Sequence, residues 1–505
     1  MRSSSGSSKL THSWRSSGID TGRDVTDKTS KLTNYIKNLE LTCEYSREMS
    51  GVVHTNTAEL FLVGQDASNM MGNPAGVCYP TSTAEVQEAV RWARSKGMAF
   101  IARGAGTGLA GGAIPTAGSL VICLTKMNNI RSIDVHRRAA WVEPGVLNAD
   151  LSRHTSRHGL HFAPDPSSQQ SCTIGGNVAN NSGGPHCLSE GVTSAHILAL
   201  EVVLPSGEVC ILDAENSLFD LRGAFIGSEG MFGIATAIEV RLVQNPPHVS
   251  TMVVGFASVH EGAMAVSAII AHGIIPSALE MMDAPITRAV EEYVHAGFPL
   301  DAAAMLIVEI DGLEHSVSDG SRQVKDIVLR FGATSFKVAQ SAAERALIWK
   351  GRKTAFGAIA RIQPNYYLHD TVVPRKKLAE VLSQVSAIAT EEQLQVMNVF
   401  HAGDGNLHPI LMFDKRVDGV MDRVHRAGSE IVRVSLEAGG VLSGEHGIGL
   451  EKRDFMRWMF TENDLLFQQK LRSAFDPEGI SNPHKVLPRG SGCADTSSIP
   501  PGSWM

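Results

Sequence analysis

The sequence predicts an α+β fold of two large units, and three observations support this. Residues 103–112 are half glycine and lie between two apolar, strand-like segments. Two further glycine-rich zones follow before residue 234. Beyond Pro246-Pro247, strand-like segments alternate with amphipathic helical segments, which is typical of a sheet covered by helices.

The composition is that of an ordinary globular protein, with 505 residues, 43% hydrophobic and 19% charged. At about 150 residues per domain, this length allows two large units or three smaller ones. The net charge of −7 without a long basic run excludes a nucleic-acid footprint. No apolar stretch reaches about 18 residues, which excludes a membrane-spanning helix. The seven scattered cysteines contain no C-x-x-C, which argues against an iron–sulfur cluster and favours a reducing compartment.

Residues 1–30 are rich in serine, and three basic residues precede the first acidic one, Asp20. They lack an apolar core, so they are not a secretory signal. A mitochondrial transit peptide, a disordered tail and a start placed too early all remain open. We therefore expect a cytoplasmic protein, peripheral to a membrane through a partner, or a mitochondrial one. Residues 1–56 are interpreted as an N-terminal extension.

The first unit, residues 57–246, begins with a helix that leads into the glycine run. Ser82 and Glu85 form a predicted capping box, apolar residues then recur at helical spacing, and Gly97 ends the helix. Strands are expected at 98–102 and 119–124, on either side of the run. Two more are expected at 138–142 and 199–204.

The glycine run resembles a Rossmann fingerprint, because Gly106, Gly108 and Gly111 match G-x-G-x-x-G with Asp134 downstream. That fingerprint must open a helix, however, and residues 114–118 contain Pro115 and Gly118. A strand–glycine loop–strand unit remains suited to a pyrophosphate, because glycines let backbone N–H groups approach an anion. The alternative is a tight turn in solvent.

The other glycine-rich zones, residues 164–184 and 227–233, are predicted as loops. Small and amide-bearing residues spread over three zones indicate one extended ligand, such as a dinucleotide, and the alternative is a set of unrelated turns.

The second unit, residues 247–488, is predicted as an open-faced sheet with helices. The expected elements are strands at 250–257 and 304–309 and helices at 263–272 and 322–331. Residues 489–505 are interpreted as a disordered tail.

Ligand-type residues are densest near the C-terminus. A strand at 398–401 leads into a Gly-Asp-Gly-Asn turn, and the resulting hairpin would bring His401 and His408 side by side. After a helix at 419–437, Glu445 and His446 lie on a glycine-flanked loop.

Two histidines and one glutamate, His401, His408 and Glu445, fit a catalytic metal site with an open position. His446 then remains as a general base, because its ordinary pKa is near neutrality. The alternative for each histidine is a purely structural role. Arg352 is either a clamp for a substrate carboxylate or a solvated surface residue.

These motifs resemble the FAD-linked 2-hydroxyacid dehydrogenases of the vanillyl-alcohol oxidase/PCMH superfamily. Members include the glycolate oxidase flavoprotein subunit, D-lactate dehydrogenase and D-2-hydroxyglutarate dehydrogenase. The resemblance covers roughly residues 57–488 and is strongest at 164–184, 401–408 and 444–449. It implies a PCMH-type, two-subdomain FAD-binding domain followed by a FAD-linked oxidase C-terminal domain.

By this resemblance, residues 104–108 hold the FAD pyrophosphate, 173–177 with Asn181 line the flavin, and 227–230 pack at the adenosine side. The full set of implied cofactor-binding residues is Arg103, Gly104, Ala105, Gly106, Thr107, Gly108, Pro164, Asp165, Ser168, Thr173, Gly175, Gly176, Asn177, Asn181, Gly183, Gly227, Glu229, Gly230, Ile234 and Asn482. The relatives bind a divalent metal, often zinc, at positions matching His401, His408 and Glu445, with His446 as the base. Arg352 becomes the expected clamp. Residues 103–112 contain no His or Cys for a covalent tether, so FAD is expected to be non-covalent.

The implied activity is oxidation of glycolate or D-lactate to the 2-oxoacid, with hydride transfer to flavin N5. Leu368 and Ile410 replace a lysine and an asparagine of the hydroxyglutarate enzymes, which favours a small monocarboxylate. Met231-Phe232 also departs from the usual Thr-Leu. The electrons would pass to an iron–sulfur subunit, a cytochrome, a quinone or an electron-transfer flavoprotein. The alternatives are a hydroxyglutarate dehydrogenase, a silent FAD-binding subunit, non-redox flavin chemistry as in alkyl-dihydroxyacetonephosphate synthases, and a metal-dependent hydrolase.

Overall fold

The structure, a computed structural model, describes residues 52–215 and 219–488. The predictions for residues 1–30 and for the tail at 489–505 lie outside the described residues. Within the described ranges, no helix combines the length and the apolar composition that crossing a membrane requires.

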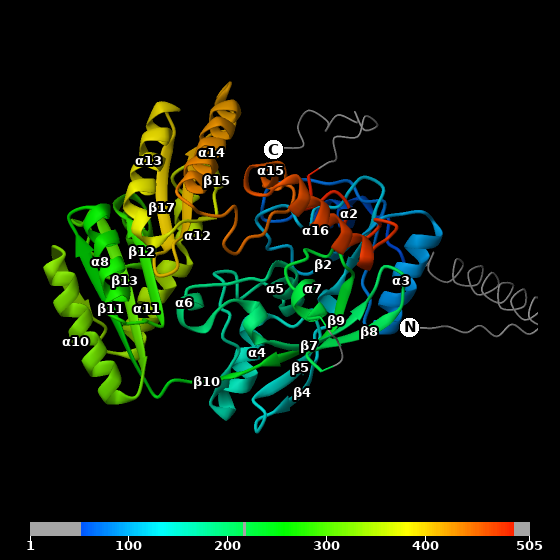
Figure 1. The fold of residues 1–505 in the computed structure, drawn as a ribbon, viewed down its shortest axis with the longest axis horizontal. Coiled ribbons are helices and arrows are strands. Elements are labelled where there is room, and N and C mark those ends of the chain that lie inside the picture. Colours follow the sequence, from blue (N-terminus) through cyan, green and yellow to red (C-terminus); the bar gives the residue numbers. More distant parts are fainter. Residues whose placement is uncertain (1–51, 216–218, 489–505) are drawn as a thin grey trace, which may run out of the picture. The chain divides into compact units, whose positions relative to one another are not determined.

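The first part of the described chain contains two larger sheets and a short two-stranded one (Figure 1). A parallel sheet has the order β1 (Gly76–Cys78), β3 (Leu120–Cys123), β2 (Phe100–Arg103). An antiparallel sheet has the order β4 (Ile130–Asp134), β5 (Ala139–Val142), β9 (Ile234–Arg241), β7 (Ile197–Val203), β8 (Val209–Asp213). A short pair joins β6 (Leu160–His161) to β10 (Val243–Gln244), and the helices are α2 (Thr57–Val63), α3 (Thr83–Ser95), α4 (Asn148–Thr155), α5 (Ile174–Asn180), α6 (Cys187–Glu190) and α7 (Leu221–Phe225). All four strands predicted in this part are present.

Helix α3 begins as predicted, but its cap differs in one detail. The Ser82 hydroxyl accepts the Glu85 amide hydrogen at 3.3 Å, which satisfies one of the orphan donors of the first turn. The Glu85 carboxylate accepts from the backbone N–H of Thr81 at 2.7 Å, one residue before the position that a capping box requires. The N-cap at Ser82 is therefore confirmed, but the full capping box was wrong, because the Glu85 carboxylate does not accept from Ser82 N.

The two predictions for the glycine zones differ in outcome. Residues 104–119 are all described, none is helical, and β2 and β3 pair in parallel on either side, which confirms the strand–loop–strand unit. Residues 174–180, predicted as loop, form helix α5. The Thr173 hydroxyl caps it by accepting from Gly176 N at 3.2 Å, and Ile174 and Val178 bury one face. Adjacent glycines obscured this helical spacing in the sequence.

The second part is built on an eight-stranded antiparallel sheet. Its order is β14 (Ala333–Val338), β11 (His248–Phe256), β13 (Ala304–Gly312), β12 (Ala278–Asp283), β17 (Gln395–His401), β18 (Asn406–Phe413), β15 (Asn365–Leu368), and β16 (Thr371–Val372) also pairs with β18. One face packs against α8 (Val259–Ala271), α10 (Glu314–Arg330), α13 (Leu378–Glu391) and α14 (Val420–Glu437). The other packs against α9 (Ala284–Val294), α11 (Ala342–Lys353) and α12 (Ala355–Ile359). The expectation of an open-faced sheet was therefore wrong.

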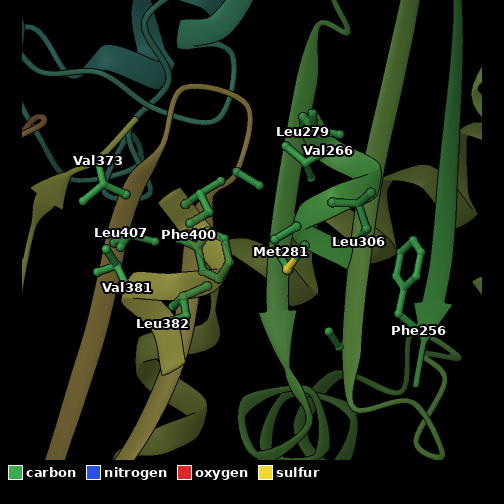
Figure 2. Packing of buried hydrophobic residues seen from close by; sticks show 14 of the residues in the cluster. Phe256, Val266, Leu279, Met281, Leu306, Val373, Val381, Leu382, Phe400 and Leu407 are labelled. Atoms are coloured by element: carbon green, nitrogen blue, oxygen red, sulfur yellow. The ribbon is translucent and has the colours of Figure 1, made fainter. Parts of the chain in front are cut away.

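Alternation along the strands separates the two cores. In β12, Leu279 and Met281 belong to the core under α8, whereas Ala278 and Met282 belong to the core under α9. Figure 2 shows Leu279 and Met281 beside Val266 of α8, and Phe400 of β17 beside α13. With both faces buried, the strands read as nearly continuous apolar runs, so periodicity alone did not reveal the second layer of helices.

The last described segment returns to the first part of the chain. It contains α15 (Met456–Met459) and α16 (Glu462–Phe475). Ser481 forms a bridge with Phe100 of β2, and the Lys485 ammonium donates to the Ile114 carbonyl at 2.7 Å. Pro246-Pro247 lies between β10 and β11, which belong to different sheets. The division into domains at this point stays a prediction.

Candidate active site

One cavity of about 670 Å³ joins the glycine zones to the histidine cluster. Its walls include the loop after β2, the start of α5, Glu229 and Gly230 on one side, and His408, Glu445 and His446 on the other. A volume of this size falls within the range of cofactor sites, which is roughly 300–1,000 Å³. The cavity therefore connects a cradle of small residues with titratable groups.

Most of the implied cofactor residues lie around this space. Those that line the large cavity are Gly104, Ala105, Gly106, Thr107, Gly108, Ser168, Thr173, Gly176, Asn177, Glu229 and Gly230. A second cavity of about 50 Å³ shares part of this wall and adds Arg103, Gly175 and Ile234.

The remaining implied residues do not line either cavity, and several of them make hydrogen bonds that hold the lining segments in place. The Pro164 carbonyl accepts from the Asn148 side-chain amide at 2.8 Å, and the Asn181 side chain accepts from Ser194 N at 2.8 Å. Gly227 N donates to the Val178 carbonyl at 2.9 Å. Asn482 donates to the Gly112 and Glu229 carbonyls at 2.9 and 2.6 Å, which ties the C-terminal segment to two glycine zones.

The glycine run fits a dinucleotide because its backbone is packed too closely for side chains. A Cβ at Gly104 would lie 2.4 Å from the Thr173 hydroxyl, and one at Gly106, where φ is +70°, would lie 2.1 Å from the Arg103 guanidinium. At Gly108, by contrast, no atom of the described chain beyond its two chain neighbours lies within 4 Å of the point where a Cβ would stand. The buried Arg103 retains one guanidinium nitrogen without a hydrogen-bond partner among the described residues. A cation and exposed N–H groups at a bare backbone suit a pyrophosphate.

The predicted hairpin of β17 and β18 is present. His401 pairs with Asn406 and His408 with Val399, so the two histidines are diagonal neighbours with ring centroids 5.2 Å apart. Gly405, at φ +82°, provides the left-handed residue of the turn. The expectation that the turn brings the two side chains together is confirmed.

Glu445 completes the predicted cluster. Its Oε1 lies 3.2 Å from His401 Nε2 and 3.7 Å from His408 Nε2. One ligand atom from each of these three residues falls within 4.8 Å of the others. His408 Nε2 is buried and makes no hydrogen bond within the described chain. Although burial alone would lower the pKa of His401, Glu280 and Glu445 raise it well above its usual value. The cluster favours a positive charge, and its donors fit a divalent cation.

Asp370, His408 and His446 form a second set with suitable spacing. The Asp370 carboxylate is already occupied, because Ser443 Oγ donates to it at 2.6 Å and His446 N at 3.0 Å. Gly444 N, Glu445 N and the buried Lys452 ammonium donate to it as well. A carboxylate with this many donors is a poor metal ligand, so the geometry favours the set that contains Glu445.

Asp370 is a residue that sequence reasoning missed, and it organises the loop that carries His446. Burial opposes its charge, but Lys452 and the nearby histidines hold the pKa of Asp370 well below its usual range. The carboxylate gathers consecutive backbone N–H groups of residues 444–446, which fixes the loop. No local pattern around Asp370 announces this contact, which spans 76 positions in the case of His446.

His446 stacks on His408 with centroids 4.9 Å apart and lines the cavity. Its Nε2 lies 3.8 Å from Glu445 Oε1, and its Nδ1 lies 3.9 Å from Asp370 Oδ2. Burial lowers the pKa of His446 to about 4, more than Asp370 raises it. The imidazole thus holds a free lone pair at neutral pH, although the same shift makes it a weaker base than an ordinary histidine.

Glu229 connects the third glycine zone to the same loop. Its carboxylate accepts from Ile448 N at 2.7 Å and from Gly449 N at 2.9 Å. Burial raises the pKa of Glu229 to about 7, against the effect of these two bonds. These contacts place Glu229 beside the loop that carries His446, and a location at the adenosine side stays a prediction.

Arg352, the expected clamp, does not line the described cavity. Its side chain is 1% exposed, and its Nε and one terminal nitrogen contact Glu280 Oε2 at 2.7 and 2.6 Å. The surface alternative is wrong, because the guanidinium is buried, and the role of Arg352 as a clamp stays a prediction. The next residue, Lys353, lines the cavity and donates to Asp165 Oδ2 at 2.9 Å. Sequence reasoning passed over Lys353 because its neighbour matched the family pattern.

Three other residues named from the sequence lie outside the cavity wall as described. Leu368 and Ile410 are cross-strand partners in β15 and β18, and both are buried in the core under α9. Gly183 is close to the cluster, since a Cβ there would lie 2.9 Å from Glu445 Oε2.

Comparison with known families agrees with this arrangement. Residues 74–213 match the FAD binding domain, and residues 245–486 match the C-terminal domain of FAD linked oxidases. The glycolate oxidase subunit GlcD of Escherichia coli (strain K12) is 44% identical over 402 residues, which are 79% of this chain and 81% of that protein. D-lactate dehydrogenase of Anaerostipes hadrus is 32% identical over 425 residues, which are 80% of this chain and 88% of that protein.

Solved structures confirm the predicted PCMH-type fold. p-Cresol methylhydroxylase with substrate bound aligns with a TM-score of 0.73 at 15% identity, covering 89% of this chain and 97% of that one. Alkyldihydroxyacetonephosphate synthase aligns with a TM-score of 0.69 at 17% identity, covering 88% and 86%. At this identity the likeness shows the fold alone. The two domain matches and the relatives together establish that the chain belongs to the FAD-linked oxidases, in the group that contains the glycolate oxidase subunit GlcD and D-lactate dehydrogenase.

Proposed function

We propose that this protein oxidises a small 2-hydroxyacid, glycolate or D-lactate, to the 2-oxoacid. The observation that carries the proposal is the single cavity that joins the glycine zones to His446 and the three-residue cluster. The relatives named glycolate oxidase subunit and D-lactate dehydrogenase support the substrate class. Electrons then leave the protein through an acceptor other than oxygen.

The glycine zones would hold FAD. Residues 104–108 would receive the pyrophosphate, and residues 173–177 would line the ring system. Without His or Cys in residues 103–112, the cofactor would stay non-covalent. FAD, when bound, supplies the acceptor for the hydride that leaves the substrate carbon.

His401, His408 and Glu445 would hold a divalent cation, zinc in our proposal, with a position left open for substrate. Such a cation makes a bound hydroxyl more acidic. His446 would take the hydroxyl proton at Nε2, the nitrogen nearer to Glu445. Its neutral form at pH 7 and its fixed loop suit it to this role.

The substrate carboxylate needs a cation, and Lys353 is our choice for it. It is the one lysine or arginine among the described residues that line the large cavity. Asp165 holds its ammonium in place. Arg352 would then act from behind the wall, through Glu280.

Anaerobic absorbance spectroscopy tests the proposal. Purified protein reconstituted with FAD is mixed separately with glycolate, D-lactate, L-lactate and D-2-hydroxyglutarate. We expect glycolate or D-lactate to bleach the flavin band and L-lactate to leave it unchanged. Bleaching by hydroxyglutarate alone would reassign the substrate. A bound flavin that none of the four reduces would favour a silent FAD-binding subunit and overturn the proposal.

A further inference from the structure

A buried carboxylate behind the cavity, Glu280, joins two residues that the sequence placed in the site. Glu280 Oε1 lies 2.6 Å from His401 Nδ1, and Glu280 Oε2 accepts from Arg352 Nε at 2.7 Å. The side chains of Glu280 and Arg352 are each 1% exposed, and that of His401 is 6% exposed. The three side chains thus form a continuous chain of charge-assisted contacts from α11 to the metal cluster.

The sheet sets this contact. Glu280 of β12 is the direct cross-strand partner of His401 of β17. Its neighbours on the same face of β12, Ala278 and Met282, belong to the apolar core under α9. A charge among apolar side chains is strongly destabilising unless it is paired. Arg352 provides that pairing, so the carboxylate stays charged where it faces His401.

The contact determines how His401 presents its other nitrogen. With Nδ1 donating to Glu280, the ring of His401 is fixed, and a metal that displaces the second proton would meet the lone pair of Nε2. That Nε2 is the atom that lies 3.2 Å from Glu445 Oε1. A carboxylate that accepts from one imidazole nitrogen while the other faces a metal is a recurrent device for orienting a ligand and raising its basicity.

We propose that Glu280 is a positioning residue of the metal site, and that Arg352 serves the site by neutralising Glu280. This inference rests on the metal ligands of the proposed function. It gives a role to Glu280, which no motif in the sequence marked, and to Arg352 a role other than that of a clamp.

The test is the zinc affinity of the FAD-loaded protein, measured by competition with a chromophoric chelator. E280Q keeps the shape of the side chain, but an amide has only one acceptor oxygen. Its NH₂ group would therefore face a donor on either His401 or Arg352. We expect zinc to bind about 10–100-fold more weakly, with flavin content unchanged.

Two further variants separate positioning from loss of stability. D283N alters another buried acid of β12, which accepts from Asn398 N and from Ile286 N at the start of α9, whereas the hydrogen bonds of the His401 ring in the described chain go to Glu280 and Glu445. It is expected to keep zinc affinity within about twofold. The double variant E280M/R352M leaves no unpaired buried charge and no acceptor for His401 Nδ1, so it keeps the fold while the support of His401 is still missing. We expect it to show the same zinc loss as E280Q.

The inference is overturned if E280Q binds zinc within twofold of the unaltered protein, or if D283N loses as much affinity. It is also overturned if the double variant regains full affinity, or if the unaltered protein binds neither zinc nor manganese. None of these zinc-affinity measurements requires the enzyme to turn over. Failure of hydroxyacid to bleach the flavin would therefore count against the proposed function alone.

Discussion

The two sides of the cavity differ in how they are built. Around Gly104 and Gly106, the shape depends on missing side chains, because a Cβ at either position would meet its neighbours at 2.4 Å or less. Around His401 and Glu445, it depends on charged side chains held by buried partners, above all Glu280 and Asp370. At Gly104 and Gly106 the loop has no room for an added side chain, whereas the charge network depends on keeping every partner.

This difference implies that the two sides fail separately. Substitutions on the glycine side should alter flavin binding and leave the metal cluster intact. Substitutions on the histidine side should alter turnover or metal binding and leave the flavin in place. The predictions below test this separation, from the largest expected effect to the smallest.

Replacement of His446 should have the largest effect. H446A removes the proposed base, so kcat should fall about 10²–10⁴-fold while the flavin stays bound. Steady-state kinetics and the flavin absorbance of the same sample provide the measurement. H425A, at an exposed histidine of α14, is the matched control and should stay within twofold. Turnover of H446A within a few-fold of the unaltered protein would remove His446 from its role.

Replacement of Lys353 should weaken substrate binding. A charge-assisted hydrogen bond contributes about 1.5–3 kcal/mol, so K353M should raise KM about 10–100-fold. K350M, at an exposed lysine of the same helix, should leave KM unchanged. If R352K raises KM more than K353M does and retains its metal, the clamp belongs to Arg352, as the resemblance implied.

Glu309 of β13 is paired with His186 and Arg345, and it should make stability depend on acid pH. Burial acts to raise its pKa, but hydrogen bonds from His186 and Arg345 dominate and lower the pKa of Glu309 to about 2. A depressed pKa contributes stability that is present above the unfolded value of about 4.3 and is lost as pH falls toward 2.

Urea unfolding between pH 6 and pH 2.5 measures that contribution. The free energy difference between the unaltered protein and E309Q should shrink over this range by on the order of 2 kcal/mol, allowing for the partial exposure of Arg345. A difference independent of pH would contradict the assignment.

Replacement of Gly108 should have the smallest effect and probes the glycine side. No protein atom lies within 4 Å of a Cβ there, yet the residue lines the cavity. G108A should leave the flavin-free protein's Tm within about 1 °C and weaken FAD binding by roughly tenfold, because the methyl group would meet the cofactor. G357A, also in open space but on α12, should change neither quantity. Unchanged FAD affinity of G108A would place the cofactor elsewhere.

Much of the site was readable from short windows of sequence. The turn chemistry at 403–406 predicts the hairpin that brings His401 and His408 together, and Pro115 excludes a helix after the glycine run. Helix α5 was missed because its two adjacent glycines leave too few apolar residues to show a helical periodicity. The partner of Arg352 was missed because a surface arginine and a buried one look alike until the fold places Glu280 beside it.

The sequence by itself determined the strand–loop–strand cradle, the hairpin of His401 and His408, and the family, because each depends on residues a few positions apart. Only the tertiary structure decided which charges meet. His401 and Glu280 are 121 positions apart, and Asp370 and His446 are 76 apart. Turn and strand preferences act locally, whereas a buried ion pair forms only where sheet register and helix packing bring its partners into the same low-dielectric space.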